Sequence, residues 1–127
     1  MSEERKRTIL VVDHDEAMAQ CIEAILRQAG FTVELAASGS EALRPLGDTR
    51  IDLVIVDQAT VQRDAFTRLL EMRKNPAKMR VLVTCAGGRE AELAKVLPTV
   101  EELRADATLP KPFRESELLA AVRTVLS

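Results

Sequence analysis

Aromatic residues are almost absent from this chain, which has three Phe and neither Trp nor Tyr among its 127 residues. The core is therefore expected to be aliphatic, and the aromatic platforms on which nucleic-acid bases stack are not expected. Long hydrophobic runs are absent too, so no segment approaches the roughly 20 apolar residues of a membrane-spanning helix. The charged start, residues 1–7, precedes only a short apolar run, which does not fit a signal peptide.

A large excess of charge of either sign is also lacking, because 18 basic residues face 20 acidic ones and the formal net charge is −2. Without a basic excess to release counterions, this domain is not expected to bind nucleic acid. Cys21 and Cys85 follow no metal-binding spacing and are expected to be reduced thiols of a cytoplasmic protein. The remaining composition, 46% hydrophobic and 30% charged, is typical of one folded domain spanning residues 1–127.

Hydrophobic periodicity predicts a strand followed by a helix, five times over. Asp15 is placed to cap the first helix and Gly30 to end it, Pro45 is expected near the end of the second, and Pro98 divides the fourth. This alternation predicts an α/β fold with a parallel sheet and helices on both faces. The expected strands are 7–12, 31–35, 51–56, 81–85 and 107–109, and the expected helices are 16–28, one opening at 38–41, 64–74, 89–104 and 115–126.

Charged residues stand where three of these strands end. Asp13 follows the first strand, Asp57 follows the third, and Lys111 precedes a proline just after the fifth. Because the carboxyl ends of parallel strands share one edge of a sheet, we expect these side chains to meet there. Two carboxylates and an ammonium suit a phosphoryl group and a divalent cation. His14 stands where a second acid would be expected beside Asp13.

These segments resemble the receiver domain of bacterial two-component response regulators over essentially the whole chain. The residues that carry the resemblance are 9–13, 52–57 and the Lys-Pro-Phe of 111–113, together with Cys85-Ala86 where the family usually has Thr-Ala or Ser-Ala. The resemblance implies a flavodoxin-like, doubly wound (βα)5 fold whose five-stranded parallel sheet has the order 2-1-3-4-5. It also implies a signalling domain rather than an enzyme of multiple turnover.

The resemblance implies a role for each residue of the cluster. Asp57 would accept a phosphoryl group from a phosphohistidine of a histidine kinase or phosphotransfer protein. Mg²⁺ would be held by Asp13, Asp57 and the backbone carbonyl of Ala59, and Lys111 would pair with the phosphoryl oxygens. A downstream protein, or a second copy of the chain, would bind the face formed by the helix 89–104, the strand 107–109 and the helix 115–126.

Several positions depart from the family pattern. His14 removes one negative charge and one oxygen ligand, so it either serves as a ligand that favours Mn²⁺ over Mg²⁺ or, when protonated, replaces part of the cation's charge. Cys85 occupies the position of the switch hydroxyl, and Thr84 would supply that hydroxyl if the strand register shifts by one. Thr108 stands at the switch aromatic position. A weakened or unconventional switch is therefore predicted.

Two further departures lie in the loops. Val61-Gln62 stands where Pro-Gly often follows the phosphoacceptor, and residues 87–104 exceed the usual length by about one helical turn. We expect these departures to affect the switch more than they affect the fold.

Two other functions fit parts of the sequence. A receiver-like domain can serve as a phosphorylation-independent interaction module. The Asp13-His14-Asp15 triplet and the strand ending at Thr84 also resemble motifs of haloacid-dehalogenase-type phosphohydrolases, in which the first Asp is the nucleophile. Ala17 stands where that family has Thr or Val, and Asp57 would have no role in it. A phosphatase assay tests the hydrolase hypothesis. Reaction with acetyl phosphate distinguishes a phosphoryl-accepting receiver from a phosphorylation-independent interaction module.

Overall fold

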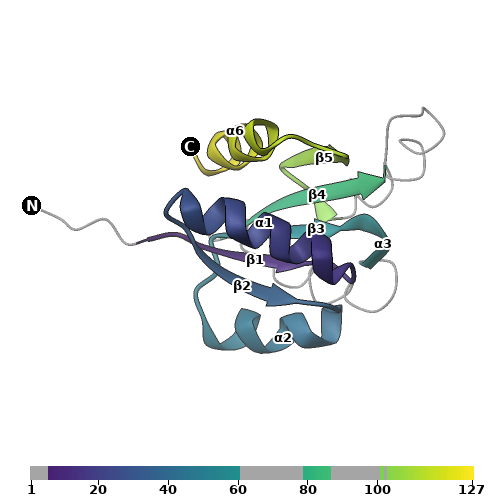
Figure 1. Ribbon diagram of the computed structural model, residues 1–127. Coiled ribbons are helices and arrows are strands. Elements are labelled where there is room, and N and C mark those ends of the chain that lie inside the picture. Colours follow the sequence, from purple (N-terminus) through teal and green to yellow (C-terminus); the bar gives the residue numbers. More distant parts are fainter. Residues whose placement is uncertain (1–5, 61–78, 87–100, 102) are drawn as a thin grey trace, which may run out of the picture.

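The structure is a computed structural model that describes residues 6–60, 79–86, 101 and 103–127 (Figure 1). Its five strands form one sheet in which every pairing is parallel and the order is β2-β1-β3-β4-β5. The predicted flavodoxin-like strand order 2-1-3-4-5 is therefore confirmed. The strands are β1 (Thr8–Val12), β2 (Thr32–Ala36), β3 (Leu53–Asp57), β4 (Arg80–Ala86) and β5 (Ala107–Lys111).

Helices cover both faces of the sheet, as predicted (Figure 1). On one face, α1 and α6 pack over alternate residues of the central strands, and this layer contains Ile9, Val11, Ile22, Leu26, Ile55, Leu82, Leu118 and Val122. On the other face, α2 packs over the intervening residues, and this layer contains Leu10, Val12, Ala42, Leu46, Val54, Val56, Val81 and Val83. The buried residues of both layers include no aromatic ring, as expected, and Phe31 and Phe113 pack against the first layer as partly buried residues. The described helices are α1 (Glu16–Gln28), α2 (Gly39–Asp48), α3 (Gln58–Thr60) and α6 (Glu115–Leu126).

Local signals set both ends of the first helix, and the second helix contains a proline. Asp15 caps α1, because its Oδ1 accepts a hydrogen bond of 3.2 Å from the backbone N–H of Met18. Gly30 follows that helix with a φ of +99°, a conformation that glycine adopts without strain. The predicted capping and ending of α1 are thus confirmed. Pro45 lies inside α2, which continues past it to Asp48.

The fifth strand is longer than predicted. The sequence predicted a short strand over 107–109, but β5 continues through Pro110 to Lys111, which pair with Cys85 and Ala86 of β4. An edge strand tolerates proline, because the missing N–H is not needed by a neighbour on the open side. As a result, Lys111 is the last residue of a strand and is held in register with β4.

Several sequence predictions lie outside the described residues. They are the helix 64–74, the Val61-Gln62 departure and most of 87–104, including Pro98; Glu101 and Leu103 at the end of that segment are helical. In the part of the chain that the structure describes, no helix has the length and apolar character needed to cross a membrane.

Candidate functional site

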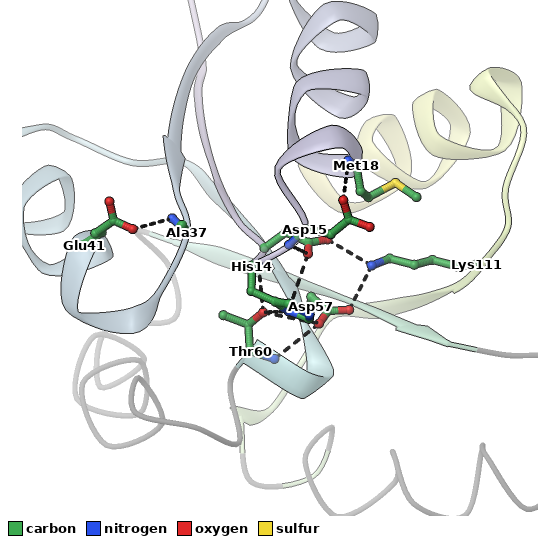
Figure 2. A network of polar contacts seen from close by, with 9 residues as sticks. His14, Asp15, Met18, Ala37, Glu41, Asp57, Thr60 and Lys111 are labelled. Carbon is green, nitrogen blue, oxygen red and sulfur yellow. Dashed lines mark hydrogen bonds and ion pairs between the residues drawn. The ribbon is translucent and has the colours of Figure 1, made fainter.

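Three strands bring charged side chains together at the carboxyl edge of the sheet. Asp13 directly follows β1, and Asp57 and Lys111 are the last residues of β3 and β5. The Lys111 Nζ donates a hydrogen bond of 2.9 Å to Asp13 Oδ2. It donates another of 2.9 Å to Asp57 Oδ1 (Figure 2). The predicted meeting of these three side chains is confirmed.

The cluster is largely withdrawn from water. Asp13 is 2% exposed and Asp57 5% exposed, while the Lys111 side chain is 18% exposed. Burial by itself would lower the pKa of Lys111, but its hydrogen bonds and ion pairs with Asp13 and Asp57 outweigh burial and raise the pKa above the ordinary lysine value. Lys111 is therefore charged at neutral pH and offsets the repulsion between the two carboxylates.

The two carboxylates are also held by the backbone. Asp13 Oδ1 accepts a hydrogen bond of 2.9 Å from the N–H of Asp15, and the Asp13 N–H donates to the carbonyl of Ala36. Asp57 Oδ2 accepts from the backbone N–H of Thr60 at 3.2 Å, and the Thr60 hydroxyl Oγ1 lies 3.3 Å away (Figure 2). Lys111 therefore faces one oxygen of Asp57, and Thr60 faces the other.

His14 lies at the open side of this cluster, with its side chain 44% exposed. Its Nδ1 is 3.6 Å from Asp57 Oδ2 and 3.9 Å from Asp13 Oδ1. The same Nδ1 is 2.9 Å from the Thr60 hydroxyl oxygen. The structure therefore places the imidazole beside both carboxylates and the Thr60 hydroxyl.

These side chains offer the donor set of a divalent cation. One ligand atom from each of Asp13, His14 and Asp57 lies within 4.8 Å of the others. Two carboxylates supply the oxygen ligands that Mg²⁺ prefers, and the imidazole nitrogen suits Mn²⁺ better. Ala59, whose carbonyl the family resemblance names, lies on α3 two residues after Asp57.

Thr60 is the site residue that the sequence analysis did not identify. It is 1% exposed and lies on the short α3, which turns the chain back over the end of β3. The sequence signal for Thr60 was its place three residues after Asp57. At this spacing an aspartate that caps a helix accepts a hydrogen bond from a backbone N–H. Asp57 accepts the Thr60 N–H in this way.

A sequence model of the response regulator receiver domain matches residues 9–123. The chain belongs to this family. Its general role is to take part in phosphoryl transfer from histidine kinases in two-component signalling. The resemblance inferred from the sequence is thereby confirmed. Receiver domains bind Mg²⁺ at an acidic pocket, and in this chain Asp13, His14 and Asp57 form a cluster that offers ligand atoms for a metal.

Known relatives and structures agree with this membership. The transcriptional regulatory protein CpxR of Klebsiella pneumoniae and the response regulator MprA of Mycobacterium ulcerans are each 35% identical over 118 residues, 93% of this chain. The chain spans about half the length of these relatives, 48% and 49% respectively. Among solved structures, a putative response regulator from Chloroflexus aurantiacus is 33% identical, with a TM-score of 0.80 over 96% of this chain and 98% of that one.

The chemotaxis response regulator CheY4 of Vibrio cholerae is 25% identical, with a TM-score of 0.81 over 96% of this chain and 100% of that one.

The residues that the sequence analysis assigned to the switch, Cys85, Thr84 and Thr108, lie on β4 and β5. Burial raises the pKa of the Cys85 thiol, the charge of Asp57 raises it further, and the charge of Lys111 lowers it. Thr84 is the β4 neighbour of Asp57 in the sheet register, and its buried hydroxyl has no hydrogen-bond partner among the described residues. Thr108 is exposed on β5.

Proposed function

We propose that this receiver domain takes a phosphoryl group onto Asp57 from a phosphohistidine of a histidine kinase or phosphotransfer protein. The observation that carries the proposal is the Lys111 ammonium, which bonds Asp13 and Asp57 at 2.9 Å each in a buried pocket. A lysine held between two carboxylates stands where negative charge would accumulate when a phosphoryl group reaches Asp57. Such an arrangement is suited to phosphoryl transfer by positioning and charge compensation.

The chemistry needs little from the protein beyond these groups. An oxygen of Asp57 forms the new P–O bond while the P–N bond to the donor imidazole breaks, and the bonding electron pair stays on that nitrogen, which takes up a proton. The product is an acyl phosphate. Lys111 then exchanges its contact with Asp57 Oδ1 for a phosphoryl oxygen, while its hydrogen bond to Asp13 keeps it in the pocket.

Asp13, Asp57 and the backbone carbonyl of Ala59 are the groups proposed to hold Mg²⁺. When bound, the cation neutralises charge on the phosphoryl oxygens. Because His14 replaces an acid, this site has fewer oxygen ligands than a receiver with two neighbouring acids, and Mn²⁺ is the alternative cation.

We propose further that the switch is weak. The thiol of Cys85 is a poor hydrogen-bond donor to a new phosphoryl group, and Thr108 offers no aromatic ring to move inward. Binding of a downstream protein, or of a second copy, to the face that includes β5 and α6 would then depend only modestly on phosphorylation. Thr84 carries the hydroxyl nearest to Cys85 in sequence and is the alternative switch residue.

The test is the intact mass of the protein after incubation with acetyl phosphate and Mg²⁺. The wild-type chain should gain one phosphoryl group, and Asp57→Asn should gain none. Asp52→Asn is the matched control, because Asp52 lies at the other end of the third strand, where its carboxylate accepts a hydrogen bond from the Thr8 N–H. Absence of phosphate on folded wild type would overturn the proposal and favour a phosphorylation-independent interaction module.

A further inference from the structure

The Thr60 hydroxyl contacts more polar groups than any other hydroxyl described at this site. The backbone N–H of His14 donates to Thr60 Oγ1 at 3.1 Å, the His14 Nδ1 lies 2.9 Å from it, and Asp57 Oδ2 lies 3.3 Å from it. Thr60 is buried, so these contacts are not exchanged freely for water. This one oxygen therefore joins the loop after β1 to the phosphoacceptor carboxylate.

The hydrogen-bonding capacity of a hydroxyl limits how these contacts can be assigned. A threonine hydroxyl has one proton to donate and two lone pairs that accept. The His14 backbone N–H is a donor and occupies one lone pair. One proton and one lone pair then remain for Asp57 Oδ2 and His14 Nδ1. The carboxylate can only accept, so the hydroxyl proton goes to Asp57 and the lone pair must be filled by a proton on His14 Nδ1.

The opposite assignment leaves a contact unsatisfied. If the hydroxyl donated to His14 Nδ1, a lone pair of Thr60 Oγ1 would face a carboxylate oxygen of Asp57 at 3.3 Å. Two oxygen lone pairs facing each other without a proton between them are unfavourable in a largely buried pocket.

We propose that Thr60 is a positioning residue that holds His14 in the Nδ1–H tautomer, so that His14 acts in this pocket as an N–H donor and not as an Nδ1 metal ligand. The consequence for cation binding rests on the proposed receiver function, whereas the hydrogen-bond assignment rests on the geometry alone. With a proton on Nδ1, the nitrogen nearest the carboxylates cannot coordinate a cation, and the N–H contributes positive charge to the two-acid site. The cation is then left to Asp13, Asp57 and the backbone.

The test uses the fact that the chain contains one histidine. Long-range ¹H–¹⁵N correlation of the untagged, metal-free protein at about pH 9, where an ordinary imidazole is neutral, reports which ring nitrogen carries the proton. Wild type should show a protonated Nδ1 and a bare Nε2. Thr60→Val removes the hydroxyl at nearly constant shape and should move the proton to Nε2, the tautomer that free histidine favours. Thr60→Ser restores a hydroxyl and should retain the Nδ1–H form.

Two results would overturn the proposal: a bare Nδ1 in the wild type, or an Nδ1–H form that persists in folded Thr60→Val. A second arm adds Mg²⁺ to the wild type, and His14 Nδ1 should keep its proton; loss of that proton on Mg²⁺ binding would make the histidine a ligand after all. The tautomer is measured without phosphate. Failure of Asp57 phosphorylation with the expected tautomer would therefore count against the proposed function only.

Discussion

The Lys111 ammonium lies 2.9 Å from Oδ1 of Asp57, although 54 positions separate the two residues in the chain. Parallel strand order produces this contact, because β3 and β5 flank β4 and all three end at the same edge of the sheet. Lys111 also holds Asp13 at the same distance, so removing it would leave two buried carboxylates without their shared cation.

Lys111→Met should lower the free energy of unfolding by about 3 kcal/mol at pH 7, the low end for breaking a buried ion pair because the lysine is partly exposed. The difference from wild type should also depend on pH. Since the folded pKa of Lys111 is raised, its stabilisation is complete below the unfolded value of 10.5 and is lost as the pH rises through the folded value. Urea unfolding at several alkaline pH values checks this.

The control for that experiment is Asp57→Asn in the Lys111→Met background. It removes one of the two carboxylates left facing each other and should recover part of the lost stability. A stability difference that stays constant from neutral pH to well above the folded lysine pKa would contradict the assigned role of Lys111.

Two buried threonines should respond oppositely to the same substitution. Thr84→Val removes a hydroxyl that has no hydrogen-bond partner among the described residues, so it should be neutral or stabilise by up to about 2 kcal/mol. Thr60→Val removes a hydroxyl with three polar neighbours and should destabilise by about 1–3 kcal/mol. Chemical unfolding measures the free energy of unfolding of each variant. Equal changes in the two variants would contradict the prediction.

The two cysteines should differ in reactivity toward a thiol reagent such as Ellman's. Cys21 is exposed and should react promptly, whereas Cys85 is buried and its thiol pKa is raised above 9.0 by burial and by Asp57, so little reactive thiolate is present. Near pH 8, one thiol per folded chain should react quickly and the second only after denaturation. In Cys21→Ser, the fast phase should disappear. Two fast thiols in the folded wild type would be inconsistent with this burial.

His14→Asp should bind Mg²⁺ more tightly than the wild type, on the order of tenfold or about 1.4 kcal/mol, because it adds a charged oxygen ligand beside Asp13. His14→Asn is the matched control, since it supplies an oxygen without the charge. The same titration with Mn²⁺ should show a similar gain, because an imidazole that carries a proton on Nδ1 is not a ligand that the substitution takes away. Unchanged Mg²⁺ affinity in both variants would remove this position from the cation site.

The sequence predicted the fold and the central cluster because both depend on simple patterns. Aliphatic runs ending in Asp13 and Asp57 define central parallel strands, and topology then brings their ends together. The predicted end of the fifth strand at 109 was wrong, because backbone pairing with β4 continues through Pro110 to Lys111. Thr60 was missed because its role depends on α3 turning back and on a contact with His14, which is 46 positions away.

Phosphorylation is expected to change the conformation of this domain only modestly. A hydrogen bond from a switch hydroxyl to a phosphoryl oxygen can contribute about 1.5–3 kcal/mol, and the Cys85 thiol supplies little of it. A shift in equilibrium cannot exceed the differential binding that drives it, so the active state should be only partly populated. Beryllofluoride, a phosphoryl mimic, should therefore alter partner binding or self-association by well under a hundredfold.

Cys85→Thr restores the hydroxyl and should enlarge the response to beryllofluoride. Cys21→Thr makes the same chemical change at an exposed position of α1 and should leave the response unchanged. Sedimentation measures self-association, and amide spectra of β5 and α6 report the change of state directly. A wild-type response of a hundredfold or more, about 2.7 kcal/mol, would mean that other groups replace the hydroxyl and the ring. Thr84 would then be the first residue to test, because its hydroxyl is buried on the same strand and lies in register with Asp57.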